Sequence, residues 1–106
     1  MNPQVMKANN PVLWKIKKLS REVLGNAGSE NYRQKLVFDL LNAVRANDQN
    51  RFLWILLRAL NVHSKDNPKA KELASVLMKV FPSSEADFEK AAYSIIFGIM
   101  AGGDEE

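Results

Sequence analysis

Helix start and stop signals recur along this chain of 106 residues and predict helices joined by short connections. Asn10 can cap a helix whose first position is Pro11, where the missing amide hydrogen of proline costs nothing. Gly25 follows as a stop, and Ser29 caps a second helix that reaches Arg45. The first half of the chain is therefore predicted to form helices over residues 11–24 and 30–45.

The second half is divided in the same way. A polar turn at residues 46–50 precedes a third helix over about residues 51–60. Pro68 opens a fourth helix, which Pro82 closes. The fifth helix starts at Ser84, with Asp87 in capping-box spacing, and ends at Gly102 and Gly103.

Apolar periodicity supports helices throughout, and no segment alternates as a strand would. The fifth helix carries an inward stripe at three-and-four spacing: Phe88, Ala91, Ala92, Ile95, Ile96, Ile99 and Met100. The third helix is apolar around its circumference over residues 52–57, so we expect it to be the central helix of the bundle. The fold class predicted is a compact all-α bundle of about five helices.

Length and composition are typical of one intracellular domain. A hydrophobic content of 46% is enough for one modest core, which predicts a domain over residues 11–103 between a flexible segment, 1–10, and an acidic tail, 104–106. The chain has no cysteine, which excludes disulfides and thiolate chemistry. No secretory leader or membrane-length apolar stretch occurs, so we expect a cytoplasmic protein without a membrane partner.

Charge is segregated along the chain. Residues 1–82 carry fourteen Lys and Arg against six Asp and Glu, a balance of +8, whereas residues 83–106 carry one Lys against six acids, a balance of −5. A basic surface on a small domain favours a polyanion partner, because cations that neutralise phosphates release counterions. The sequence therefore predicts nucleic-acid binding by the basic body.

The first helix carries the clearest local pattern. At about 100° per residue, Trp14, Lys17, Lys18 and Arg21 gather opposite the apolar side of the helix, with Lys15 nearby. A tryptophan beside cations can stack on an unpaired base. The alternative is that the cations form an ordinary solvated face and that Trp14 packs against a neighbouring helix.

A second basic set surrounds the turn into the third helix. Arg45 precedes this turn, and Arg51 and Arg58 are seven residues apart on one face. Arginine suits phosphate because its planar fork donates two parallel hydrogen bonds. For Arg58 the alternative is an ion pair with Asp39 or Asp48 inside the bundle. The residues predicted to contact nucleic acid are Trp14, Lys15, Lys17, Lys18, Arg21, Arg45 and Arg51.

No arrangement of residues predicts catalysis, a metal site, a cofactor or a small-molecule substrate. The single histidine, His63, is expected in a polar loop and has no second His or Cys with which to bind a metal. Neither a nucleophile elbow nor a phosphate-binding glycine loop occurs. The acids that start the fifth helix are explained by the helix dipole. The sequence predicts a protein that is not an enzyme.

Two segments resemble a known family. Residues 40–60, LLNAVRANDQNRFLWILLRAL, and residues 88–102, FEKAAYSIIFGIMAG, are similar to the C-terminal helical bundle of the large subunit of type I CRISPR effector complexes (type I-B-like). In several such systems this bundle is also made alone as the small subunit of the complex, Cascade, by translation from an internal start. Whether this chain is a separate gene product or such a fragment stays open.

The resemblance implies a role in antiviral defence. Small subunits of this kind lie in a few copies along the crRNA-guided complex, contact neighbouring subunits and each other, and hold target or non-target DNA during unwinding. Because the guide reads the sequence, such a protein needs only backbone charge and stacking. The alternatives are a helical adaptor that binds only protein, with Trp14 and Phe38 as anchors, and a helix-turn-helix regulator, which the apolar third helix disfavours.

Overall fold

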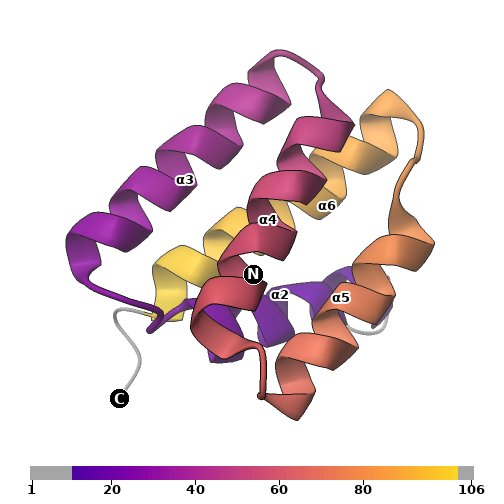
Figure 1. Ribbon diagram of the computed structural model, residues 1–106. Coiled ribbons are helices and arrows are strands. Elements are labelled where there is room, and N and C mark those ends of the chain that lie inside the picture. The colour runs from indigo at the N-terminus through magenta and orange to yellow at the C-terminus, as the bar shows by residue number, and fades with distance from the viewer. Residues whose placement is uncertain (1–10, 103–106) are drawn as a thin grey trace.

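The computed structural model describes residues 11–102, which form five helices and confirm the predicted all-α bundle (Figure 1). In chain order the helices are α2 (Pro11–Leu24), α3 (Glu30–Arg45), α4 (Gln49–Ser64), α5 (Pro68–Val80) and α6 (Glu85–Gly102). The predicted flexible segment 1–10, Gly103 and the predicted acidic tail lie outside the described residues.

The predicted capping residues start their helices. The Ser29 hydroxyl accepts a hydrogen bond from the Tyr32 amide at 3.1 Å, and the Ser84 hydroxyl accepts one from the Asp87 amide at 3.2 Å. Before the predicted start at Pro68, the Asn67 side chain accepts one from the Lys69 amide at 2.9 Å. Each bond satisfies a backbone donor that has no partner within the helix, so these starts are confirmed.

Helix α4 is longer than predicted at both ends. It begins at Gln49 because the carboxylate of Asp48 accepts a hydrogen bond from the Arg51 amide at 3.0 Å and caps it. It continues to Ser64 because no glycine or proline follows residue 60 until Pro68. The prediction that His63 lies in a loop is therefore wrong, since His63 belongs to the last turn of α4.

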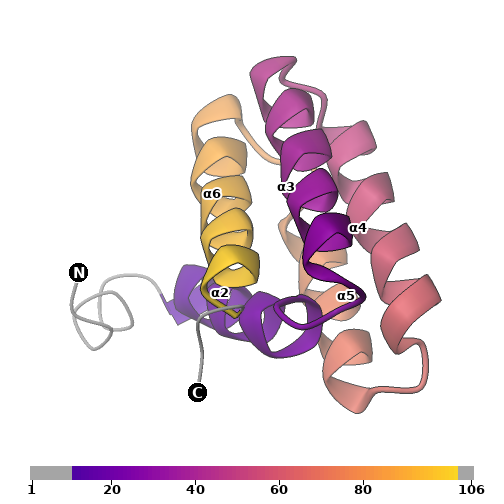
Figure 2. The same cartoon turned by 90° about the vertical axis from the view of Figure 1, so that its left-hand side faces the viewer.

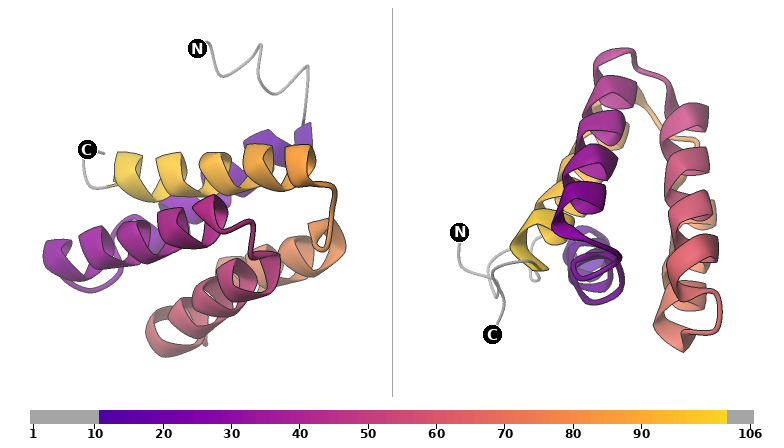
Figure 3. Two further views of the ribbon diagram at one scale, coloured as in Figure 1. Left: turned by 90° about the horizontal axis from the view of Figure 1, so that it is seen from above. Right: turned by 60° about the vertical axis from the view of Figure 1, so that its left-hand side comes forward.

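The helices pack with α2 crossing the others. Helices α3 and α4 lie side by side and are antiparallel, joined by a loop at the top of the view (Figure 1). Helix α2 lies across the lower ends of α3 and α6 (Figure 2). Figure 3 shows α6 and α4 on opposite sides of the bundle. Helix α4 thus lies at an edge of the described domain.

Glycines bring α2 and α6 into close contact. A Cβ atom added to Gly25 would lie 2.6 Å from the Cα of Gly102, and one added to Gly98 would overlap the carbonyl oxygen of Lys17 and lie 3.2 Å from the Cβ of Ser20. The backbones of α2 and α6 lie so close together here that only glycine fits without a clash. This contact fixes α2 against α6.

An aromatic cluster within the core joins α4, α6 and the loop between α5 and α6. The rings of Phe52, Phe81 and Phe88 meet edge to face, with centroids 5.4–6.1 Å apart. At the same end, the Gln49 side chain donates a hydrogen bond to the Ser83 carbonyl at 2.6 Å and accepts one from the Ser83 amide at 2.9 Å. These contacts hold the start of α4 beside the start of α6.

The prediction that the third helix is the centre of the bundle is wrong. Phe52 and Leu56 are fully buried, but Trp54 is 60% exposed and Val62 is 62% exposed. Helix α6 is more buried than α4. Met100 of α6 was predicted to face inward but is exposed. Apolar residues around a whole helix indicate burial only if every face has a partner, and one face of α4 has none among the described residues.

Candidate nucleic-acid interface and the α3–α4 groove

Four predicted contact residues lie on α2, and the backbones of two of them, Lys17 and Arg21, lie against Gly98 of α6. Lys18 is exposed, and Trp14, Lys17 and Arg21 are half-buried. The ammonium of Lys18 lies 5.2 Å from the centre of a Trp14 ring, a cation–π distance. The structure therefore brings a cation and an aromatic ring together on α2.

Lys15 faces a different neighbour. Its ammonium forms an ion pair with Glu72 of α5 at 2.8 Å, and Lys69 forms a second pair between these helices with Glu22 at 3.2 Å. Lys15 lowers the pKa of the Glu72 carboxyl, mainly through its hydrogen bond and secondly through its positive charge. The charge of Lys15 is offset, which makes it the weakest of the predicted phosphate contacts.

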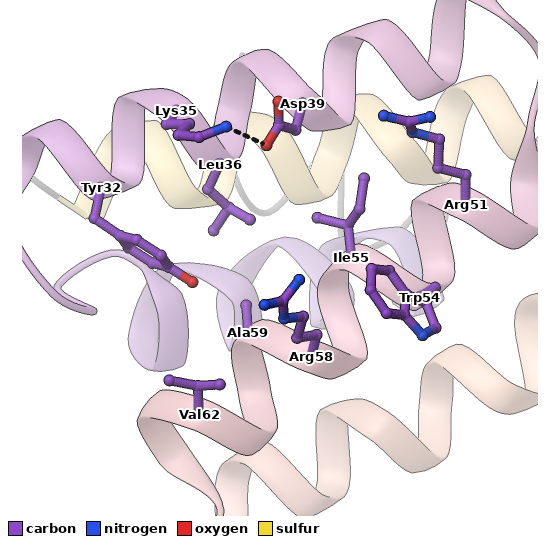
Figure 4. A pocket seen from close by; sticks show the side chains of 10 residues that line it. All are labelled: Tyr32, Lys35, Leu36, Asp39, Arg51, Trp54, Ile55, Arg58, Ala59 and Val62. Atoms are coloured by element: carbon purple, nitrogen blue, oxygen red, sulfur yellow. Dashed lines mark hydrogen bonds and ion pairs between the residues drawn. The ribbon is translucent and has the colours of Figure 1, made fainter.

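Arg45 and Arg51 lie on either side of the turn between α3 and α4. Both are exposed, and neither forms an ion pair within residues 11–102. Arg45 occupies the last turn of α3, where the helix dipole favours a cation. Arg51 points over a groove to which α2 contributes no residue (Figure 4). The predicted residues therefore do not form one continuous site.

This groove lies between α3 and α4, and we call it the α3–α4 groove (Figure 4). Its volume is about 690 Å³. The lining residues come from successive turns of two helices: Tyr32, Lys35, Leu36, Asp39, Arg51, Trp54, Ile55, Arg58, Ala59 and Val62. An apolar floor and charged edges make it a surface suited to an amphipathic ligand.

Positive charge dominates the α3–α4 groove. Lys35 is paired with Asp39 at 3.2 Å, whereas the guanidinium of Arg58 lies 5.4 Å from the centre of a Trp54 ring. The alternative in which Arg58 pairs with Asp39 or Asp48 is not realised, because Arg58 forms no ion pair within residues 11–102. Two guanidinium groups, those of Arg58 and Arg51, therefore remain without an acidic partner in the groove.

Tyr32 closes one end of the α3–α4 groove. Its ring lies against the imidazole of His63, with centroids 4.5 Å apart, so α3 and the last turn of α4 meet there. Burial raises the pKa of the Tyr32 hydroxyl, and the positive charge of Arg58 opposes this rise. The tyrosine remains a neutral hydroxyl at neutral pH and can donate a hydrogen bond to a ligand in the groove.

A second apolar surface lies on α6. Tyr93, Phe97 and Met100 follow one another at helical spacing, are 39–55% exposed, and form a stripe on this helix. The rings of Tyr93 and Phe97 are stacked with centroids 6.2 Å apart.

The described residues contain neither a metal-binding cluster nor a membrane-spanning helix. Within residues 11–102, no three His, Cys, Asp or Glu side chains lie close enough to hold a metal ion. None of the helices α2 to α6 has the length and apolar content that a membrane span requires.

Sequence reasoning missed most of the α3–α4 groove. Of its lining residues, only Arg51 was among the predicted contacts, and Trp54 was assigned to the core. A signal was present, because Arg51, Trp54, Arg58 and Val62 recur at three-and-four spacing and so share one face of α4. Two arginines on that face argue against its burial.

Comparison with known proteins identifies no relative of this chain. No family model, no curated protein and no solved structure matches this chain. The similarity of residues 40–60 and 88–102 to a CRISPR subunit stays a prediction. The functional argument therefore rests on the residues and their geometry.

Proposed function

We propose that this protein is a non-catalytic small subunit of a crRNA-guided type I CRISPR interference complex. In this role it binds the DNA backbone without reading sequence, stabilises the unwound target and bridges neighbouring subunits. Three features support the proposal: the small all-α bundle, the two segments that resemble the family, and cations that no acid of the described domain neutralises.

The main support for this proposal is the set of cations that form no ion pair within the described residues. Four of the predicted contacts have no ion pair within residues 11–102: Lys17, Lys18, Arg45 and Arg51. A cation without an internal partner can neutralise a phosphate without first breaking an ion pair. Trp14, beside Lys18, adds a ring on which an unpaired base can stack.

Fluorescence anisotropy with labelled single-stranded and duplex DNA tests this binding. We expect binding without sequence preference, weakened strongly by Lys17→Glu/Lys18→Glu. The matched control is Lys71→Glu/Lys79→Glu, which makes the same charge change at exposed positions of α5. Absence of binding at low salt, or equal losses in both variants, would refute a DNA contact on α2.

Co-purification tests the assignment to a complex. A tagged copy of the chain, expressed in cells that carry a type I CRISPR system, is expected to retain crRNA and the other effector subunits. RNA sequencing of the purified material identifies crRNA by its repeat-derived ends. Recovery of the chain without crRNA would contradict the assignment even if the isolated protein binds DNA.

The second candidate is a protein adaptor without nucleic-acid contact. It is favoured by the exposed apolar side chains of Phe38 on α3 and Trp54 on α4, together with the α6 stripe. Salt separates the two functions, because phosphate binding weakens steeply with salt and an apolar helix interface does not.

A further inference from the structure

Helix α4 exposes apolar side chains along the α3–α4 groove. Trp54 and Val62 are exposed and Ile55 is half-buried, and all three line the α3–α4 groove. A contiguous apolar patch of this kind on a small domain marks an interaction surface. The groove is therefore a candidate docking site.

The charges of the α3–α4 groove select an acidic partner. Asp39 neutralises Lys35, so Arg51 and Arg58 give the groove two positive charges that nothing in residues 11–102 offsets. Both arginines line the groove beside Trp54 (Figure 4). A ligand with carboxylates at matching positions would complement them.

The shape of the α3–α4 groove suits a helix. It runs between two helices of 16 residues each, which at 1.5 Å per residue are about 24 Å long. A third helix packed along them would bury its apolar face against both. Arg51 and Arg58 are seven residues apart, about 10.5 Å along α4, which is two turns of a partner helix.

The floor of the groove fits a helix better than a nucleic-acid strand. Leu36, Ile55 and Ala59 are aliphatic and offer no ring on which a base can stack. The two rings of the lining already have neighbours, since Tyr32 lies against His63 and Trp54 lies beside Arg58. Leucine and methionine side chains of an amphipathic helix pack well on such a floor. The observations therefore favour protein over nucleic acid as the ligand of this surface.

We propose that the α3–α4 groove binds an acidic amphipathic helix of a partner protein. Carboxylates at positions i and i+7 of that helix pair with Arg51 and Arg58, and apolar side chains at i+3 and i+4 pack on Trp54 and Ile55. No residue of α2 takes part, so this site is separate from the DNA contact proposed for Lys17 and Lys18, and Arg51 is the one proposed DNA contact that it shares.

A labelled helical peptide of about 16 residues tests the proposal, with Glu at i and i+7 and Leu at i+3 and i+4. Anisotropy is measured with the full chain, beside a scrambled peptide of the same composition. We expect binding with a Kd below about 100 μM, lost with the scrambled peptide. Arg51→Glu/Arg58→Glu should weaken it at least about tenfold, and Lys71→Glu/Lys79→Glu should not.

The Val62→Ser variant distinguishes binding of a peptide helix in the groove from binding of a nucleic-acid strand. Val62 is exposed, so the variant is expected to fold, which circular dichroism checks. It should weaken the peptide several-fold and leave binding of single-stranded DNA unchanged. No peptide binding up to about 1 mM, or a loss of DNA binding in Val62→Ser as large as the loss of peptide binding, would overturn the proposal. Retention of peptide binding in Lys17→Glu/Lys18→Glu distinguishes this site from the DNA contact.

Discussion

Alanine at Gly98 is predicted to destabilise the protein, although alanine is the better helix former. Gly98 lies inside α6, where replacement of glycine by alanine normally stabilises a helix by about 1 kcal/mol. Here the new Cβ would overlap the backbone carbonyl oxygen of Lys17 and lie 3.3 Å from the amide nitrogen of Arg21. Relief requires α2 and α6 to move apart, because neither obstacle is a flexible side chain.

The magnitude follows from these two opposing terms. Overpacking at a close contact costs about 1–3 kcal/mol, and a backbone obstacle places Gly98 at the upper end of that range. After subtraction of the helix-propensity gain of about 1 kcal/mol, a net loss of about 2 kcal/mol remains. For a domain of this size, each kcal/mol lowers Tm by about 4–8 °C.

Urea unfolding followed by circular dichroism measures this loss. Ser75→Ala, at an exposed position of α5, is the control for helix propensity and should be neutral or slightly stabilising. A Gly98→Ala variant as stable as the native protein, or more stable, would show that α2 and α6 do not approach each other as described.

Other predictions concern α4 and the α2–α5 contact. Phe52→Ala should lose about 3–5 kcal/mol in urea unfolding because the ring is fully buried, while Trp54→Ala should lose less than about 1 kcal/mol; equal losses would contradict the orientation of α4. Asp48→Ala should cost about 1 kcal/mol by removing the α4 cap, and no loss of stability would argue against that cap. Lys15 lowers the pKa of Glu72 below its ordinary value of 4.5, so their pairing stabilises the fold fully above that pH and is lost as the pH falls through the lowered pKa. Lys15→Met should therefore reduce the acid sensitivity of the unfolding free energy, and an unchanged pH profile would contradict the pairing.

Helix starts were predictable because their signals are local. Ser29 and Pro68 act within one turn of their helices, so no knowledge of the tertiary structure is needed to place them. The end of α4 was missed because the polar residues after position 60 resemble a loop in composition, although none of them breaks a helix.

The α3–α4 groove was less predictable because apolar periodicity does not say what covers an apolar residue. Trp54 and Phe52 are both apolar and only two residues apart, yet one is exposed and the other is fully buried. The same limit applies to charge, since only the packing of α5 against α2 shows that Lys15 is paired, whereas Lys18 forms no ion pair within residues 11–102. Partners across helices are set by tertiary packing, which local sequence does not encode.

The salt dependence of binding to single-stranded DNA tests the proposed function most directly. Each neutralised phosphate contributes about −0.7 to the slope of log affinity against log salt concentration. Contacts by Lys17, Lys18, Arg45 and Arg51 therefore predict a slope of about −3, which becomes about 1.4 less steep in Lys17→Glu/Lys18→Glu. A slope near zero, or one that is unchanged in this variant, would contradict DNA backbone binding by these cations.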